Sequence, residues 1–407
     1  MNAMPYDVVV FGATSFVGRL VCRHLAGASG PTGLKWAAAG RSPGKLEELR
    51  QQLPSAADIP LIIADATDEQ ALASICAQTR VVISTVGPYA LYGEPLVKVC
   101  AETGTDYCDL AGEVHWVRRM IDRYESTAAA TGARIVNCCG FDSIPSDLGV
   151  HFLQREALER FGRYFTRILM RVKAMRGGIS GGTAASIMNV AKEAAADLAL
   201  RRDLQNPYLL CPPDQRPTIR QENLSRPQYD AAFQSWLAPF IMAGINTRVV
   251  HRSNAVLGSI YGPDFRYDEA VLTGQGLRGR MKAFSIAGAL IGFMTMSALS
   301  PTRWFLRRFV VPAPGQGPSP EAQKKGFYDL RFLGLLEDGQ TLRVKVTGDA
   351  DPGYGSTSKI LAETGALLAR GGGATNAGGF WTPATLLGDQ LLEVLQKRAG
   401  LTFQVME

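Results

Sequence analysis

The chain has 407 residues and a formal net charge of +6. This length exceeds what one ordinary hydrophobic core organises, so two domains are the default expectation. The charge is modest and its basic residues are spread along the chain. No run of Lys and Arg interleaved with aromatics indicates a nucleic-acid groove, so we expect no nucleic-acid partner.

Cysteine and histidine usage argues against a metal centre or a disulfide framework. The seven cysteines are irregularly spaced, and neither a C-x-x-C pair nor a Cys/His cluster occurs. We expect reduced core thiols in a cytoplasmic protein. With only four histidines, a metal site is not expected. The N-terminus enters a predicted strand almost at once, so we expect no secretory signal.

The stretch from Tyr6 to Arg19 predicts a strand, a tight turn and a helix. Residues 7–11 form an apolar, β-branched run typical of a strand buried on both faces, and glycine or serine then recurs every third residue. Small residues at such a turn let a pyrophosphate approach the backbone at a helix N-terminus. The expected contacts are Gly12, Thr14, Ser15, Phe16, Val17 and Gly18. The alternative is a strand–turn–helix with a purely structural role.

The end of the second predicted strand indicates which dinucleotide binds. Residues 34–39 read as a strand that ends in Gly40-Arg41-Ser42, with Lys45 shortly after. An NAD site of this type places an acidic residue there for the ribose 2′-OH, whereas an NADP site places Arg there for the 2′-phosphate. We therefore predict that Arg41, Ser42 and Lys45 bind NADP(H). A solvated surface Arg41 is the alternative.

The alternation of strands and helices continues to about residue 147. A third strand over 58–64 ends in Asp65, which is expected beside the adenine, and a fourth over 80–85 leads into a Gly-Pro turn. Ligands of open α/β sheets bind at this carboxyl edge, so the nicotinamide half is expected near Thr85, Gly87, Pro88 and Tyr89. With further strands over 106–110 and 134–139, the pattern predicts a doubly wound sheet.

At this point the chain resembles the saccharopine dehydrogenase-like oxidoreductases. The motifs that carry the resemblance in the first part are GATSFVG, AGRS, STVGPYALYGEPLVKVC, TDYCDLAGE and CGFDSIPSDLG. Those that extend it are SGGTAAS, APFIMAGINTRVVHRSN, PGQGPSPEAQKKGFY and DADPGYGSTSKILAE. The branch it looks most like includes the trans-acting enoyl reductases. Family members usually carry Gly where this chain has Ser15.

The resemblance implies an α/β protein with an NADP-type Rossmann domain and a reductase activity. In that family the terminal segments return to the nucleotide domain. Residues 1–147 plus about 353–407 are therefore expected to form the Rossmann domain. Residues 148–352 are expected to form an inserted α/β domain for substrate binding or dimerisation.

The inserted part is predicted to contain a mixed or antiparallel sheet. Residues 167–174 read as a strand, and Asp-Gly at 338–339 joins predicted strands over 326–336 and 340–348 into a hairpin. The glycine-rich residues 177–183 open a predicted helix over 184–200. They could bind the phosphate of a coenzyme A or carrier-protein thioester, or form a turn that lets the helix pack closely.

Residues 283–302 form a stretch of twenty residues without a charge. This length would just span a bilayer core of about 30 Å, but several Ser, Thr and Gly lower the hydrophobicity of the stretch and Pro301 ends it. We rank a buried or dimer-interface helix first, a peripheral membrane contact through residues 283–308 second, and a true span third. Trp304 and Phe305 beside Arg307 and Arg308 suit the second option.

We therefore expect an NADPH-dependent oxidoreductase. On resemblance alone, its partner is a small-molecule or carrier-bound acyl substrate with an unsaturated bond. The proton donor is sought among Tyr89, Tyr92 and His151, each of which could equally be structural. The alternatives are a saccharopine-type imine or amino-acid reductase and a non-catalytic, lipid-associated nucleotide-binding protein. A homodimer is left open.

Overall fold

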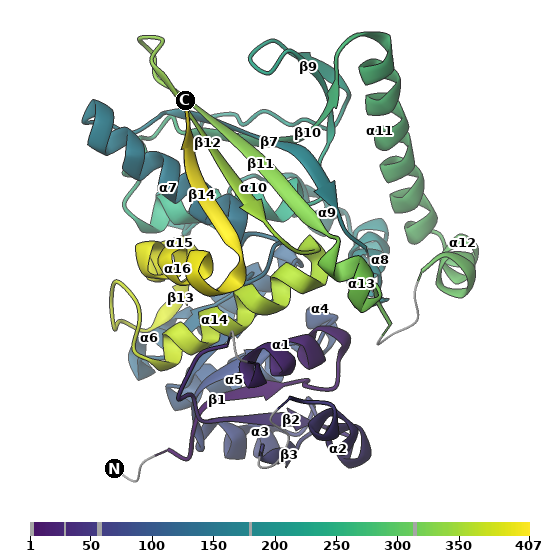
Figure 1. The fold of residues 1–407 in the computed structure, drawn as a ribbon, viewed down its shortest axis with the longest axis vertical. Helices are drawn as coiled ribbons and strands as arrows, with labels where there is room; N and C mark the ends of the chain where they lie inside the picture. Colours follow the sequence, from purple (N-terminus) through teal and green to yellow (C-terminus); the bar gives the residue numbers. More distant parts are fainter. Residues whose placement is uncertain (1–3, 28–29, 55–58, 179–180, 312–315) are drawn as a thin grey trace.

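The computed structural model describes residues 4–27, 30–54, 59–178, 181–311 and 316–407. Two seven-stranded sheets organise them, the nucleotide-type sheet below and a second sheet above in Figure 1. The first sheet is parallel throughout and has the order β13-β6-β5-β4-β1-β2-β3. Its strands are β1 (Tyr6–Phe11), β2 (Trp36–Gly40), β3 (Leu61–Ile63), β4 (Thr79–Ser84), β5 (Asp106–Asp109), β6 (Arg134–Val136) and β13 (Gly379–Trp381).

Helices cover both faces of this sheet. The six expected strands are present, which confirms the doubly wound sheet, and β13 adds a seventh from the C-terminal part. Alternate residues of β1 are buried on opposite faces of the sheet. Val8 and Val10 lie on one face, and Val9 and Phe11 lie on the other. The helices of this part are α1 (Phe16–Ala26), α2 (Pro43–Gln51), α3 (Glu69–Cys76), α4 (Tyr89–Tyr92), α5 (Glu94–Thr103), α6 (Val114–Thr131) and α14 (Thr357–Ala369).

The second sheet is mixed, as expected, with the order β14-β12-β11-β7-β10-β9-β8. Only β7 and β10 pair in parallel within it, and β11 and β12 form the predicted hairpin. Its strands are β7 (Arg167–Arg176), β8 (Gln228–Asp230), β9 (Ser235–Pro239), β10 (Arg266–Gly274), β11 (Phe327–Leu335), β12 (Thr341–Gly348) and β14 (Leu401–Met406). The helices around it are α7 (Ile144–Phe161), α8 (Gly181–Ala196), α9 (Leu198–Gln205), α10 (Ala243–Val256), α11 (Gly276–Ala298), α12 (Ser300–Phe305), α13 (Pro320–Lys324), α15 (Pro383–Leu386) and α16 (Gly388–Val394).

The C-terminal segment contributes to both sheets. Helix α14 packs on the first sheet so closely that a Cβ on Gly365 would lie 2.4 Å from Ile83 Cδ1. Oε1 of Glu363 on α14 lies 2.8 Å from Nε2 of His24 on α1, and both side chains are buried. After β13, however, the chain returns to pair β14 with β12 of the second sheet. Residues 353–407 therefore divide between the two sheets, and the assignment of all of them to the Rossmann domain is too simple.

Helix α11 contains most of the charge-free stretch and lies along the side of the molecule (Figure 1). By length and composition it could cross a membrane, since an 18-residue window has a mean hydropathy of 1.4. Only 17% of that window is buried, so the expected burial of this helix does not occur within one chain. A Cβ on Gly288 or Gly292 would meet no atom within 4 Å, so neither glycine serves close helix packing here.

Candidate cofactor and active site

The turn after β1 requires glycine at two positions. Gly12 has a φ of +82°, and a Cβ on it would lie 2.6 Å from Val86 Cγ2. A Cβ on Gly18, in the first turn of α1, would lie 2.3 Å from the carbonyl oxygen of Gly12. The helix therefore starts directly against the turn, which brings its N-terminal N–H groups and partial positive charge to the carboxyl edge of the sheet.

Ser15 replaces the usual glycine without blocking this helix N-terminus. Its Oγ accepts a hydrogen bond from Gly18 N at 2.9 Å and lies 3.0 Å from Thr85 Oγ1. Thr85 in turn donates to the Gly12 carbonyl oxygen at 2.9 Å. The serine side chain is thus used to cap α1 and to brace the turn. The amide groups of Phe16 and Val17 have no acceptor among the described residues, which leaves two donors for a pyrophosphate.

The residues at the end of β2 leave a cation and a hydroxyl free for a ligand. Arg41 is exposed, and no hydrogen bond or ion pair engages its guanidinium within the described chain. Ser42 starts α2 without a side-chain capping bond, and Lys45 is exposed one turn later. At the end of β3, hydrogen bonds from Thr67 hold the pKa of Asp65 below its usual range. The positive charge of Arg41 lowers this pKa further. The free cations suit a 2′-phosphate.

Segments far apart in sequence converge in front of α1. The Phe16 ring packs edge-on against Tyr354 with 5.1 Å between centroids, and a Cβ on Gly317 would lie 2.5 Å from the Phe16 ring. Asp351 holds this junction together. Its fully buried carboxylate accepts from Gly178 N at 3.0 Å, and from the amides of Tyr354 and Gly355 at 2.9 and 3.2 Å.

Sequence reasoning missed Asp351, although its Asp-Pro-Gly context was a turn signal. The same residue bears on the glycine-rich stretch before α8. A Cβ on Gly177 would lie 2.5 Å from Asp351 Oδ1, which favours the close-packing role for that glycine. Residues 179 and 180, which belong to the proposed anion site, lie outside the described residues.

The three candidate proton donors do not converge. Tyr89 follows the cis Gly87–Pro88 peptide and is buried, and its hydroxyl donates to Ser84 O at 3.0 Å while accepting from Leu110 N at 3.1 Å. Burial raises its pKa well above the ordinary value. Tyr92 is 44% exposed. His151 lies on α7, where its Nε2 is 3.1 Å from Asp389 Oδ1. This arrangement favours a positioning role for Tyr89.

Glu113 links the nucleotide part to α8. It follows β5 and is buried, and its two carboxylate oxygens accept from the backbone N–H groups of Tyr89 and Ala90 at 2.8 and 3.0 Å. Ser186 of α8 donates to the same carboxylate at 2.9 Å. Helix α8 is thereby held over the turn that is expected to receive the nicotinamide.

Carboxylates also gather where β5 and β6 end. Asp109 accepts from Cys138 N at 2.9 Å and from Asn137 Nδ2 at 2.8 Å, and Cys138 adopts a φ of 63°, unusual for a residue with a side chain. Asp142 lies in the same loop and is half-buried, with no hydrogen-bond partner within the described chain. Burial and, second, repulsion from Asp109 raise the pKa of Asp142 to about 6. Such a free, perturbed carboxyl is a candidate for acid–base chemistry.

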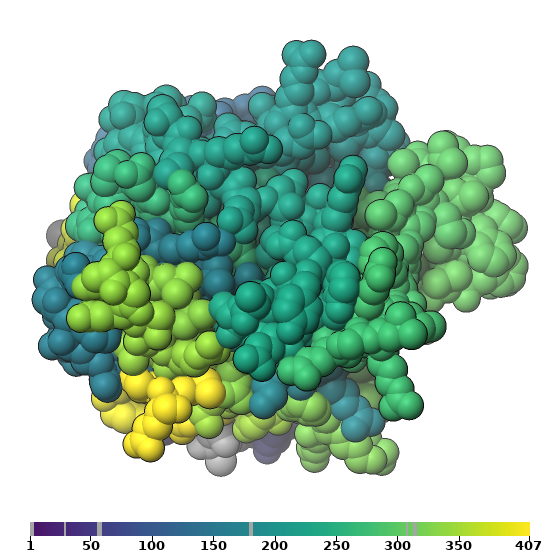
Figure 2. All heavy atoms as spheres, turned by 90° about the horizontal axis from the view of Figure 1, so that it is seen from above, coloured from purple at the N-terminus to yellow at the C-terminus, as the bar shows by residue number. Residues whose placement is uncertain are grey.

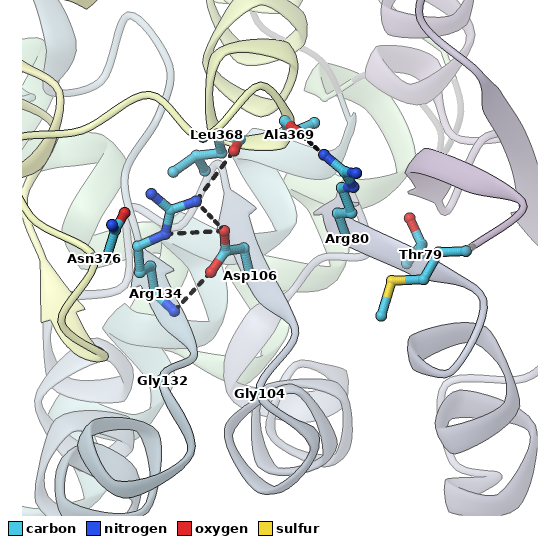
Figure 3. A pocket seen from close by; sticks show the side chains of 11 residues that line it. Thr79, Arg80, Gly104, Asp106, Gly132, Arg134, Leu368, Ala369 and Asn376 are labelled. Carbon is cyan, nitrogen blue, oxygen red and sulfur yellow. Dashed lines mark hydrogen bonds and ion pairs between the residues drawn. The ribbon is translucent and has the colours of Figure 1, made fainter. Parts of the chain in front are cut away.

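The opposite edge of the sheet holds a hollow of about 330 Å³ that we do not assign to the active site (Figure 3). It lies where β4, β5 and β6 begin, whereas ligands of open α/β sheets bind at the carboxyl ends. Its charged groups are already paired. Arg134 Nε donates to Asp106 at 3.0 Å and its Nη1 donates to Gly372 O at 2.8 Å, while Arg80 donates to Ala369 O at 3.3 Å.

Comparison with known proteins relates the chain to NADP-dependent oxidoreductases. A model of the saccharopine dehydrogenase NADP-binding domain matches residues 8–136. The chain is 39% identical over 422 residues, 99% of each chain, to a putative trans-acting enoyl reductase of Mycobacterium tuberculosis. It is 38% identical to a trans-acting enoyl reductase of Mycobacterium bovis, over 95% of this chain and 94% of the other. A saccharopine dehydrogenase (L-Glu forming) of Saccharomyces cerevisiae shares the fold over 99% and 100% of the two chains, with a TM-score of 0.56 at 14% identity.

Proposed function

The chain belongs to the saccharopine dehydrogenase-like oxidoreductases and is an NADP-dependent enzyme, and from this premise we propose that it reduces the carbon–carbon double bond of an unsaturated acyl intermediate. The observation that carries the proposal is the full-length similarity to proteins named trans-acting enoyl reductases. A free thioester or one held on a carrier protein is the expected form of the substrate.

The nucleotide site fits NADPH. Gly12 and Gly18 form a turn that has no room for a side chain, the Phe16 and Val17 amides lack acceptors within the described chain, and Arg41 is exposed at the end of β2 without a hydrogen-bond partner there. When bound there, NADPH would supply the hydride for the β carbon of an enoyl thioester. The protein must then provide a proton for the α carbon and exclude water while it does so.

We propose Asp142 as the proton donor. It lies at the carboxyl edge of the sheet, beside the Tyr89 turn. The Tyr89 hydroxyl has two hydrogen-bond partners, whereas the Asp142 carboxyl has none within the described chain. With the pKa of this carboxyl near 6, part of it stays protonated at neutral pH, as a general acid requires. Glu113 and Ser186 would hold α8 over the reacting atoms.

The test is an NADPH-oxidation assay at 340 nm on the purified full chain with three sets of compounds. The first set holds enoyl thioesters of coenzyme A and of a carrier protein, the second holds keto acids with amines, and the third arm has no substrate. Turnover with an enoyl thioester and a saturated product in mass spectrometry supports the proposal. Turnover only with keto acid and amine would establish the saccharopine-type alternative. NADPH binding without turnover in any arm would favour a non-catalytic nucleotide-binding protein.

Asp142→Asn and the surface variant Asp214→Asn form a matched pair for the same assay. Asp214 is exposed and has no hydrogen bond in the described chain. Only the first substitution is expected to lower the rate, and both are expected to bind NADPH as the wild type does. We also place the enzyme in the cytoplasm, which the seven buried free thiols support.

A further inference from the structure

The net positive charge of the chain is concentrated in one segment. Six of the 43 basic residues lie between Ala270 and Pro320, where no acidic residue occurs. The other 37 basic residues balance the 37 acidic ones, so this segment accounts for the whole net charge of +6. The basic residues are Arg278, Arg280, Lys282, Arg303, Arg307 and Arg308. The basic residues are spread along the chain as expected, and it is the absence of acidic residues that leaves this segment with a net positive charge.

The same segment carries an unusual share of the exposed apolar side chains. Of the 21 large hydrophobic side chains exposed in the described chain, 10 lie between Leu277 and Val310, so this surface is the main apolar patch. They are Leu277, Met281, Phe284, Ile291, Met294, Leu299, Trp304, Phe305, Phe309 and Val310, exposed by 38 to 71%. We call this set the apolar face. Figure 2 shows the segment as a green lobe at the side of the molecule.

The packing of α11 is inverted relative to an ordinary surface helix. Its buried residues are small, namely Gly279, Ala283, Ala287 and Ser297, and they lie toward β9, β10 and α8. Most of its large side chains are exposed or half-buried instead, and of these Phe293 and Met296 pack against the cluster that Ala184 and Met188 of α8 form with Leu306. An amphipathic helix normally buries its large apolar residues against the core, so the outer side of α11 is built to meet another apolar phase.

The charges beside the apolar face favour an anionic membrane over a second copy of the chain as its binding partner. Arg278, Lys282 and Arg308 are exposed beside the apolar face, and two copies of the chain that met through it would bring like charges together. An anionic membrane surface instead offers apolar depth and negative headgroups at once. Trp304 and Phe309, 64 and 63% exposed, are of the type that lies at a bilayer interface.

We propose that α11, α12 and residues 306–310 form a peripheral membrane-binding surface that recognises anionic lipid. The helix lies in the interface plane and does not span, because its small-residue side stays packed on the second sheet and α8. This inference does not depend on the substrate. An enzyme that acts on lipid precursors would gain access to a membrane-held substrate through it.

The experiment is vesicle co-sedimentation of the full chain. Vesicles of phosphatidylcholine alone are compared with vesicles that contain about 30% phosphatidylglycerol, at low and high salt. We expect binding to the anionic vesicles that weakens with salt, because salt screens the attraction between the basic residues and the anionic headgroups. Binding to neither kind of vesicle, or to both equally, would overturn the proposal.

Two pairs of substitutions dissect the surface. Arg278→Gln with Lys282→Gln removes two exposed charges that have no ion-pair partner in the described chain, and is expected to weaken binding to anionic vesicles by about thirtyfold. Trp304→Ser with Phe309→Ser is expected to abolish detectable sedimentation. The control, Leu158→Ser with Leu198→Ser, removes two exposed apolar side chains elsewhere and is expected to bind normally.

Measuring the oligomeric state distinguishes a membrane from a second copy of the chain as the partner of the apolar face. Light scattering of the wild type and of the Trp304/Phe309 variant is expected to give the same mass without lipid. A dimer that dissociates only in that variant would assign the apolar face to a second copy and overturn the membrane proposal. Circular dichroism and thermal melting of each variant show that the fold is retained, which is expected because the substituted side chains are exposed.

Discussion

Arg41→Ala is expected to weaken NADPH binding selectively. In the structure the Arg41 side chain is exposed and has no hydrogen bond or ion pair within the described chain, so its loss removes only a Coulombic attraction to Asp65. A hydrogen bond to a charged group contributes about 1.5–3 kcal/mol, which corresponds to a loss of NADPH affinity of about one to two orders of magnitude. NADH lacks the 2′-phosphate, so its affinity should change little.

Isothermal titration of both cofactors into the wild type and the variant measures this difference. Arg202→Ala is the matched control, because Arg202 is an exposed arginine on α9 whose side chain has no hydrogen bond or ion pair in the described chain. The melting temperature of Arg41→Ala should equal that of the wild type, since exposed substitutions usually change stability by less than about 0.5 kcal/mol. Equal weakening of NADH and NADPH, or a wild type that binds both equally, would refute the reasoning.

Three other substitutions test other parts of the structure. Gly12→Val should abolish NADPH binding in a titration and also lower the melting temperature, because a Cβ would lie 2.6 Å from Val86 Cγ2 at a φ of +82°; near-normal affinity would count against the site. Asp142→Asn should lower kcat by about 10² or more with NADPH affinity unchanged, and the wild-type rate should fall as pH rises above about 6, since the acid must be protonated. Burial raises the pKa of Glu269 from 4.5 to about 7, so its contribution to stability is complete below about pH 4.5 and is lost as pH rises through 7. Glu269→Gln should therefore reduce the fall in unfolding free energy between pH 5 and 8 by up to about 3 kcal/mol in urea titrations, and an unchanged pH dependence would contradict this.

The sequence was sufficient where one local segment determines the structure. Gly12 and Gly18 belong to a turn whose geometry follows from residues a few positions apart, and the Asp-Gly hairpin between β11 and β12 is equally local. The parallel sheet was predictable because continuous apolar strands alternate with amphipathic helices. Arg41 could be proposed for the same reason, since it directly follows its strand, and its role at the nucleotide stays a prediction.

Features that depend on contacts between distant segments were not predictable. Asp351 bonds to Gly178, 173 residues away in the sequence, and Glu113 bonds to Ser186 of α8. Nothing near either carboxylate in the sequence indicates such a partner. The exposure of α11 was missed for a related reason: its small residues and its large ones are both apolar, and only the fold determines which side faces solvent. Asp142 was seen as part of a motif, but its lack of a hydrogen-bond partner is a property of the folded loop.

The path of the chain after β12 bears on how the protein can be divided in the laboratory. Helix α14 and β13 complete the first sheet, and β14 then closes the second. A fragment that ends near residue 147 would lack α14, which exposes Val8, Val10 and Ile83, and would leave β6 as an unpaired edge. We therefore expect such a fragment to aggregate, and the intact chain to unfold in one cooperative transition, because residues 353–407 contribute to both sheets.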